Sequence, residues 1–270
     1  MEAVTSADGT EIAYERTGEG PPLVLVHGMA GDHRGWDEVS PRLASSFTVY
    51  AVDRRGRGES GDAGASANAE SYAIEREYED VAAVVEAAAA EADGDDETTL
   101  LGHSYGAICS LNAILETDDV DRLLLYEPPL GDVPVPGTFA DDLETVIDES
   151  GAEAGLETFL RDAVGLSDAA MDAMRAGDVW AARVDAASTI PREVWACQRD
   201  LFDPDAFAGV AIPVTMFVGG ESKTTMREAA EAVVAAFENG RLVSLPGQEH
   251  VANQVAPAAF VAAVLDALDA

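Results

Sequence analysis

Hydrophobic and polar positions along this chain fall into short apolar runs separated by longer, helix-forming segments. Residues 2–16 contain the turn sequence Asp8-Gly9, which predicts a short hairpin. Beyond it, continuous apolar runs recur, and such runs are typical of strands that are covered on both faces. The runs occupy residues 21–28, 47–53, 98–104, 121–127, 213–220 and 241–247.

The segments between the apolar runs favour helices. Predicted helices cover residues 71–92, which are rich in alanine, and residues 105–117, 227–238 and 257–269, the last of which opens at Pro257. Strands that alternate with helices predict an α/β fold. We therefore expect a mostly parallel, doubly wound sheet with right-handed crossovers.

One long interval breaks this alternation. From Gly131 to about Ala211 no strand pattern appears, and the aromatic and methionine residues there sit in helix-like pieces. An interval of this length is too long for a loop in a compact domain. We therefore expect a helical cap, or lid, inserted after the sixth strand. The chain then divides into a first core part (1–130), the cap (131–211) and a second core part (212–270).

The charge of the chain restricts its partners and its environment. It has 51 acidic and 16 basic residues, a net charge of −35, and Lys223 is its only lysine. Such a chain repels itself in dilute buffer, whereas molar salt shortens the screening length to about 3 Å. The composition resembles that of proteins from halophilic archaea; the alternative is an unusually acidic mesophilic protein. In both cases the charge argues against nucleic acid and anionic membranes as partners.

The remaining composition indicates the compartment. No apolar run approaches the roughly 20 residues that span a bilayer, and the N-terminal stretch lacks the pattern of a signal peptide. We therefore expect a cytoplasmic protein. Cys109 and Cys197 lie far apart in apolar contexts and are expected to be small buried hydrophobes without a disulfide. The histidines show no metal-type spacing, so no metal site is predicted.

The strongest chemical signal is Gly102-His103-Ser104-Tyr105-Gly106. This G-x-S-x-G pattern follows a predicted strand and precedes a predicted helix, the context of a nucleophile elbow. Glycines two residues either side of Ser104 give room for a sharp, strained turn that exposes its hydroxyl. The alternative is an ordinary tight turn, but the context favours Ser104 as a nucleophile.

Two further loops supply partners for such a serine. His250 follows the last predicted strand, and loops after parallel strands gather at one edge of a sheet, so it is the predicted general base. An oxyanion needs two donors, and the backbone amides of Tyr105 and Met29 are the candidates. His27, two residues before Met29, is interpreted as a buried residue that shapes this loop.

The chain resembles the α/β-hydrolase superfamily over essentially its full length. The segments that carry the resemblance are "HGMAG", "VDRRGRGES", "LLGHSYG", "LYEPP" and "LPGQEH", in the family's order and spacing. It is similar to the small esterase, lactonase and C–C hydrolase-like members, and this implies an α/β-hydrolase fold with residues 131–211 as its lid.

The resemblance implies a catalytic triad of a serine, a histidine and an acid. The position of the acid departs from the family's commonest pattern. In many members it follows the next-to-last strand as G-x-x-D, whereas residues 219–222 read Gly-Gly-Glu-Ser and place Ser222 there. Two carboxylates remain as alternatives. Glu221 comes one residue early, and Glu127 ends the preceding strand. Some haloalkane dehalogenases place their acid at that strand end, so the resemblance favours Glu127 over Glu221.

These observations predict a carboxylesterase-like serine hydrolase that acts on a small, fairly hydrophobic ester, thioester or lactone without a cofactor. Predicted substrate contacts are Trp180 and Trp195 of the cap, and His33, which either lines the pocket or fixes its loop. One alternative is a C–C hydrolase, lyase or perhydrolase that uses the same triad. The other is a non-catalytic protein of this fold that binds a small ligand. No oligomeric state is predicted.

Overall fold

The computed structural model of the chain describes residues 1–62, 72–94, 96–130, 135–166, 168–177, 179–199 and 202–269. Its centre is an eight-stranded sheet in the order β1-β2-β4-β3-β5-β6-β7-β8, in which only the first two pairings are antiparallel. The strands are β1 (Glu2–Thr5), β2 (Glu11–Thr17), β3 (Pro22–Val26), β4 (Thr48–Val52), β5 (Thr99–His103), β6 (Arg122–Tyr126), β7 (Val214–Gly219) and β8 (Gly240–Leu245). The predicted hairpin and the six predicted strands are confirmed.

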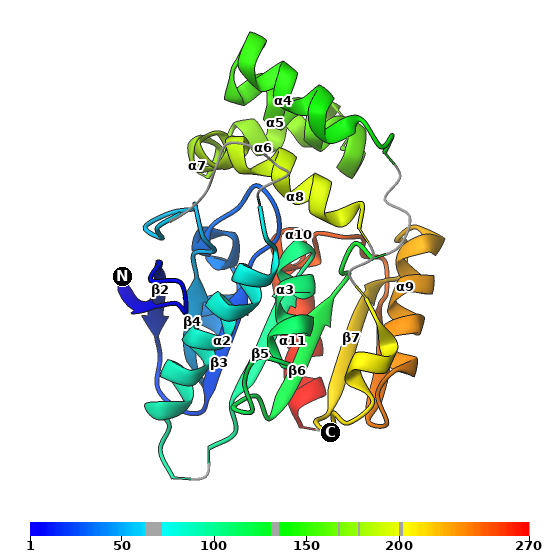
Figure 1. The fold of residues 1–270 in the computed structure, drawn as a ribbon. Coiled ribbons are helices and arrows are strands. Elements are labelled where there is room, and N and C mark those ends of the chain that lie inside the picture. Colours follow the sequence, from blue (N-terminus) through cyan, green and yellow to red (C-terminus); the bar gives the residue numbers. More distant parts are fainter. Residues whose placement is uncertain are drawn as a thin grey trace.

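Helices cover both faces of this sheet (Figure 1). The alternation of side chains along a strand explains how. In β3, Val24 and Val26 belong to the apolar cluster that includes residues of α2, α3 and α9. Leu23 and Leu25 belong to the cluster on the opposite face, which includes residues of α1 and α11. The helices are α1 (Ser40–Leu43), α2 (Glu75–Ala90), α3 (Tyr105–Ala113), α9 (Thr224–Ala235), α10 (Ala252–Val255) and α11 (Pro257–Leu268). The sequence predicted a doubly wound α/β fold, and this arrangement confirms it.

The described residues between β6 and β7 are mainly helical, and these helices lie over the carboxyl edge of the sheet (Figure 1). Its helices are α4 (Phe139–Ser150), α5 (Ala152–Phe159), α6 (Asp168–Arg175), α7 (Trp180–Asp185) and α8 (Ile190–Cys197). They bury an apolar cluster of their own, which includes Phe139, Leu156 and Ile190. We call these helices the cap helices. The insertion follows the sixth strand, as predicted.

The sequence patterns predicted which helices and strands are present more accurately than the residues at which they begin and end. Helix α9 begins at Thr224, three residues before the predicted start, and α1 and α10 were not predicted because each covers a single turn. Ser71, which opens the predicted helix over residues 71–92, and Gly131, which opens the predicted cap, lie outside the described residues. Cys109 and Cys197 are both buried and unpaired.

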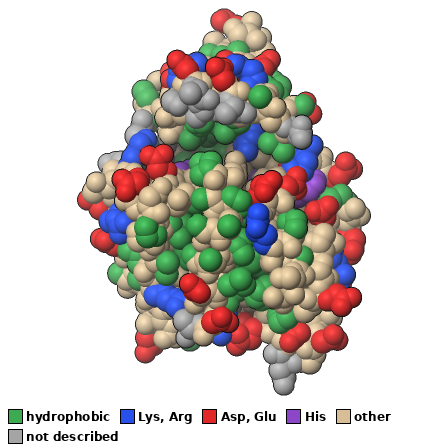
Figure 2. All heavy atoms as spheres, turned by 180° about the vertical axis from the view of Figure 1, so that it is seen from behind, with side chains coloured by type: hydrophobic (Ala, Val, Ile, Leu, Met, Phe, Trp, Pro, Cys, Tyr) green, Lys and Arg blue, Asp and Glu red, His purple; other side chains and the backbone are tan. Residues whose placement is uncertain are grey.

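Acidic side chains are spread over the face shown in Figure 2, where Lys and Arg are fewer. None of the helices within the described residues is both long enough and apolar enough to cross a membrane.

Candidate active site

Ser104 occupies a strained turn between β5 and α3. Its backbone has φ 55° and ψ −125°, a conformation that residues other than glycine rarely adopt. The flanking glycines allow this turn to pack: a Cβ atom on Gly106 would lie 2.4 Å from the carbonyl oxygens of Val26 and His27. A Cβ atom on Gly102 would lie 2.5 Å from the carbonyl oxygen of Gly106. The G-x-S-x-G pattern is therefore a steric requirement of the turn.

Ser104 forms a continuous hydrogen-bonded chain with His250 and Glu127. The His250 Nε2 atom lies 3.0 Å from the Ser104 hydroxyl oxygen, and its Nδ1 atom lies 2.8 Å from Oε2 of Glu127. These residues follow β5, β8 and β6, whose carboxyl ends meet at the edge that the cap helices cover. With a proton on Nδ1 for Glu127, the Nε2 lone pair faces the Ser104 hydroxyl, which is the geometry of a nucleophile, a base and an orienting acid.

Glu127 is fully buried and ionised. Burial by itself would raise the pKa of its carboxyl group, but the hydrogen bond and charge of His250 hold the pKa below its usual range. The Ser222 hydroxyl and the Gly219 amide add to this effect, and the amide donates to Oε1 over 2.7 Å. Ser222, which stands at the position of the family's usual acid, therefore lies beside the carboxylate that faces the histidine.

Glu221, the alternative acid, has a different environment. Its side chain is exposed, and its backbone amide donates to the Gln248 carbonyl. Among the described residues, the carboxylate hydrogen-bonded to His250 belongs to Glu127.

Two buried aromatic residues hold the loop that carries His250. His103 donates from Nε2 to the His250 carbonyl oxygen over 2.8 Å. The Tyr126 hydroxyl donates to the Glu249 carbonyl and accepts from the Ala252 amide. Burial and the neighbouring His250 lower the pKa of His103 to about 3, so this ring stays neutral at physiological pH.

The loop after β3 packs directly on the serine. A Cβ atom on Gly28 would lie 2.9 Å from Cβ of Ser104, so the adjacent Met29 lies close to the serine, and it also lines the cavity described below. His27 is buried and shapes this loop as expected: Nδ1 donates to the Gly28 carbonyl, and Nε2 accepts from the Arg54 amide. Burial and the Arg54 charge lower the pKa of His27 to about 3.

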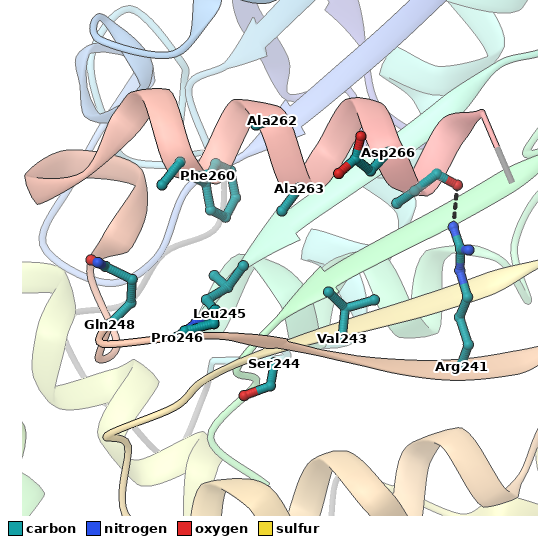
Figure 3. A pocket seen from close by; sticks show the side chains of 12 residues that line it. Arg241, Val243, Ser244, Leu245, Pro246, Gln248, Phe260, Ala262, Ala263 and Asp266 are labelled. Atoms are coloured by element: carbon teal, nitrogen blue, oxygen red, sulfur yellow. Dashed lines mark hydrogen bonds between the residues drawn. The ribbon is translucent and has the colours of Figure 1, made fainter.

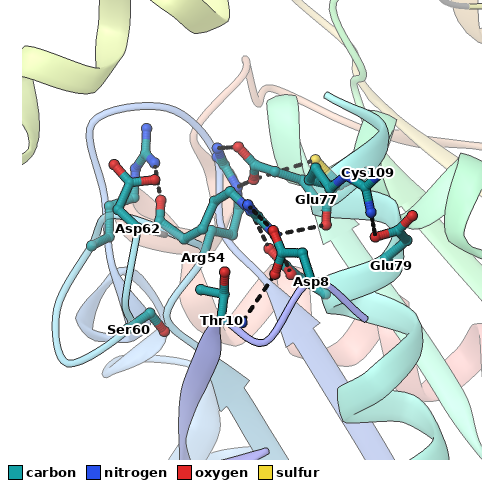
Figure 4. Close-up of polar contacts among 12 residues, drawn as sticks. Asp8, Thr10, Arg54, Ser60, Asp62, Glu77, Glu79 and Cys109 are labelled. Atoms are coloured by element: carbon teal, nitrogen blue, oxygen red, sulfur yellow. Dashed lines mark hydrogen bonds and ion pairs between the residues drawn. The ribbon is translucent and has the colours of Figure 1, made fainter. Parts of the chain in front are cut away.

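Arg54 forms hydrogen bonds with the loop that follows β3. Its guanidinium donates to the carbonyl oxygens of His27 and Gly28, and it pairs with buried Glu77 of α2 (Figure 4). It also pairs with Glu193 of α8, so a cap helix shares this buried ion pair. The carbonyl groups of residues 27 and 28 are thereby held by Arg54.

Backbone strain in the described residues is concentrated around this site. The non-glycine residues with positive φ there are Ala30, Ser104 and Glu127, with φ of 51°, 55° and 47°. They follow β3, β5 and β6, respectively. Strain of this kind costs about 1–3 kcal/mol per residue and persists where the surrounding structure fixes it, often at functional sites.

A cavity of about 260 Å³ opens beside these groups. Ser104, Glu127 and His250 line it together with mainly apolar residues from the core and the cap helices. The apolar lining residues are Met29, Pro129, Leu130, Val135, Phe159, Ala163, Val164, Val194, Cys197 and Met226. Glu221, Lys223 and Glu249 add charged groups. The sequence analysis did not predict most of these residues as part of the cavity wall, because no local pattern shows which cap side chains turn toward the sheet.

The predicted substrate contacts lie elsewhere in the described structure. His33 pairs through Nδ1 with Asp53 at 2.7 Å, so it fixes its loop. Trp180 packs among the cap helices and donates to Glu153, and Trp195 packs against the same cluster beside Arg199. None of these three residues is among those that line the cavity, and for His33 this agrees with the second of its two predicted roles. The Trp180 side chain is buried within the cap, and the Trp195 side chain is half-buried against it.

Two other features of the described residues are less suited to chemistry. A larger cavity of about 530 Å³ lies between β8 and α11 (Figure 3), but Arg241 and Asp266 are its only charged lining residues. Asp32, His33 and Asp53 bring possible metal-ligand atoms within 4.8 Å of one another. These groups are already engaged, since Asp53 accepts from His33 and Asp32 pairs with Arg34.

Comparison with known proteins identifies the family. The model of the alpha/beta hydrolase family matches residues 23–263. The chain belongs to this family. A solved alpha/beta hydrolase from Sphaerobacter thermophilus is 33% identical, with a TM-score of 0.83, over 99% of this chain and 100% of that one.

More distant hydrolases share the fold. An enol-lactonase from Burkholderia xenovorans is 21% identical with a TM-score of 0.75, over 100% of both chains. An esterase from a Rhodococcus species is 24% identical with a TM-score of 0.75, over 98% of this chain and 97% of that one.

A relative in Mycobacterium tuberculosis, itself uncharacterized, is 30% identical over 118 residues. That match covers 43% of this chain and 32% of the relative, so the chain spans about a third of the relative's length.

Proposed function

We propose that this member of the hydrolase family is a serine hydrolase that cleaves a small, fairly hydrophobic ester, thioester or lactone through an acyl-enzyme. The observation that carries the proposal is the continuous chain from Ser104 through His250 to Glu127, at 3.0 and 2.8 Å. The mainly apolar cavity of about 260 Å³ supports a small, apolar substrate. The esterase and lactonase of the same fold are consistent with it.

The reaction proceeds in two halves. Ser104 Oγ attacks the substrate carbonyl while its proton passes to Nε2 of His250, and the buried Glu127 carboxylate stabilises the resulting imidazolium. The proton then moves from Nε2 to the leaving alkoxide or thiolate, which departs and leaves an ester on Ser104. Water next gives a proton to His250 and attacks this ester. The proton then passes from Nε2 to Ser104 Oγ as the bond between Oγ and the acyl carbon breaks, which releases the acid product and the free serine.

The developing oxyanion is stabilised by the Tyr105 and Met29 amides. Tyr105 opens α3, and the first amides of a helix have no partner within the helix. Met29 lies next to Gly28, which packs against Ser104. Removal of one such donor, fixed in place before the reaction, typically lowers kcat by about 10²–10³-fold.

We further propose that residues 131–211 serve as a lid over this cavity and that the protein acts in a cytoplasm of high salt concentration. The cap helices contribute Phe159 and Val194 to the cavity wall, which supports the first part. The net charge of −35 supports the second.

The test is hydrolysis of p-nitrophenyl acetate, butyrate and octanoate and of a set of small lactones in molar KCl. The matched variants are Ser104→Ala and Ser110→Ala; Ser110 lies on α3 with a buried hydroxyl that makes no hydrogen bond among the described residues. We expect Ser104→Ala to abolish turnover and Ser110→Ala to retain it. Turnover that survives in Ser104→Ala, or a folded wild-type protein that hydrolyses none of these substrates, would contradict the proposal.

A further inference from the structure

Arg183 of α7 is a buried arginine with an unusual set of partners. Its side chain is 8% exposed, and it reaches from the cap to two loops of the core. Nη1 donates to the Ala30 carbonyl over 3.0 Å, and Nη2 donates to Oε1 of Gln254 over 3.2 Å. Its Nε atom is buried without a hydrogen-bond partner among the described residues.

The other buried arginines of the described structure are neutralised by carboxylates. Arg54, Arg55, Arg57 and Arg192 each lie within ion-pair distance of at least one Asp or Glu. No such pair is formed by Arg183 in the part of the chain that the structure describes, although the chain has 51 acidic residues. Burial lowers the pKa of the Arg183 guanidinium, and the charge of Asp32, which forms no ion pair with it, offsets this effect only in part. An unpaired buried cation is costly for a fold, so its retention calls for a gain elsewhere.

One partner of Arg183 belongs to the loop that carries Met29, and the other belongs to the helix that follows the His250 loop. Ala30 follows Met29, the proposed oxyanion donor, and its backbone is held at φ 51°. Gln254 lies on α10, which begins directly after the His250 loop. The guanidinium therefore connects the loop after β3, residues 27–30, with the helix that follows the His250 loop. We call residues 27–30 the oxyanion loop.

Arg183 completes a pattern of carbonyl contacts on the oxyanion loop. The carbonyl oxygens of residues 27 and 28 accept from Arg54, and that of Ala30 accepts from Arg183. Donors on either side of Met29 thus hold the carbonyl groups of the loop. A peptide whose neighbours are tied in this way keeps its own amide in a fixed direction.

We propose that Arg183 is a positioning residue. It holds the oxyanion loop and the His250 loop in their reactive arrangement when α7 lies against the core, as it does in this structure. The inference rests on the proposed function, since it assigns Met29 and His250 their catalytic roles. Displacement of α7 removes both hydrogen bonds together, so the catalytic groups are fully aligned only under a closed cap.

The test compares Arg183→Met and Arg183→Lys with Arg175→Met in the full-length protein. Methionine preserves much of the apolar length of the side chain and removes its donors, whereas lysine retains the charge and one point of donation. Arg175 is an arginine of α6 that pairs with Glu153, Glu157 and Asp172 and lies over the Trp180 ring of α7. All these partners belong to the cap, so it controls for the loss of contacts within the cap. Thermal unfolding and circular dichroism establish that each variant is folded.

We expect Arg183→Met to lower kcat by about 10–100-fold, because misaligned oxyanion donors lose part of the 10²–10³ that each supplies. KM should change less than about threefold, since the side chain does not line the cavity. The rate of labelling by a fluorophosphonate should fall in parallel with kcat. Arg183→Lys should recover part of the loss, and Arg175→Met should match the wild type.

A folded Arg183→Met protein with wild-type kcat would overturn the inference. A raised KM with unchanged kcat would overturn it as well, because it would make Arg183 a substrate contact. If Arg183→Met does not fold, Arg183→Lys and Gln254→Leu decide: wild-type kcat in both overturns the inference, and a loss of kcat at constant KM in either supports it. If the wild-type protein has no serine-dependent turnover, the proposed function itself fails, which is a separate outcome.

Discussion

The Nδ1 atom of His250 and the buried Glu127 carboxylate lie 2.8 Å apart, although 123 residues separate them in the sequence. Because β6 and β8 run parallel with β7 between them, the residues that follow these strands emerge at one edge of the sheet. The carboxylate also accepts from the Gly219 amide at the end of β7, which lies between them. The position of the Glu127 carboxylate is therefore fixed by contacts with residues that follow neighbouring strands of the sheet.

Replacement of Glu127 by glutamine tests this relationship. The carboxylate accepts from two donors, the Gly219 amide and Nδ1 of His250, so an amide NH₂ must face one of them. An NH₂ that faces Nδ1 favours the wrong histidine tautomer, and in either orientation the negative charge that would stabilise the imidazolium is lost. We therefore expect kcat/KM to fall by about a thousandfold or more. Ester hydrolysis by Glu127→Gln and by Glu221→Gln is the matched comparison, with less than about a threefold change expected for Glu221→Gln. The assignment is wrong if Glu221→Gln is the more damaging variant.

The Ser104 turn predicts a strong requirement for glycine at position 106. A methyl group there would lie 2.4 Å from the carbonyl oxygens of Val26 and His27, and overpacking of this kind costs about 1–3 kcal/mol or more. We expect Gly106→Ala to lower the free energy of unfolding in urea by at least about 2 kcal/mol, or to prevent folding. Gly137→Ala, where a Cβ atom meets nothing within 4 Å, should stay within about 0.5 kcal/mol of wild type. Equal stability of the two variants would refute the steric argument.

Glu77 predicts a specific acid sensitivity. Burial by itself would raise the pKa of its carboxyl group, but Arg54 holds it at about 2, below the ordinary 4.5. The unfolded chain therefore takes up this proton first, so the stability from this pair is complete above about pH 5 and is lost as the pH falls toward 2. The contribution is on the order of 3 kcal/mol.

Urea unfolding of wild type and Glu77→Gln across this pH range checks the prediction. We expect the variant to be less stable at pH 7 and the two curves to converge as the pH approaches 2. Glu86→Gln, at an exposed position of the same helix, is the control and should follow the wild type. Parallel curves for wild type and Glu77→Gln at all pH values would contradict the prediction.

The charge of the chain predicts that salt stabilises the fold. At about 0.1 M salt the screening length is roughly 10 Å, so like charges on the acidic surface repel, and at about 1 M it falls to roughly 3 Å. We expect the Tm to rise with KCl between these concentrations. Sucrose at equal osmolality separates screening from solute exclusion, since it leaves the charges unscreened. A Tm that is unchanged by KCl, or that sucrose raises equally, would speak against a role for charge screening.

Much of this fold follows from the sequence because its signals are local. Apolar runs and glycine ends located β3 to β8, and the G-x-S-x-G pattern located Ser104, since a sharp turn leaves a mark in neighbouring residues. Glu127 was favoured only through a family resemblance, because what brings it to His250 is the pairing of strands distant in the chain. The strained backbone of Ala30 had no local signal either.

The cap was the least predictable part of the site. Its helices pack on one another and on the sheet edge, so an apolar cap residue serves equally well in the cap cluster or in the cavity wall. Trp180 and Trp195 belong to the cluster, whereas Phe159 and Val194 belong also to the wall. Arg183 gave no sequence signal, because its partners, Ala30 and Gln254, come from distant segments.

The most direct test of the account is covalent labelling by a fluorophosphonate, followed by intact-mass analysis and peptide mapping in molar KCl. The account predicts one label per chain, located on Ser104, with loss of ester hydrolysis in proportion to labelling and no label on Ser104→Ala. A folded protein that takes up no label, or that is labelled at another residue while turnover continues, would contradict the claim that Ser104 is the nucleophile of a serine hydrolase.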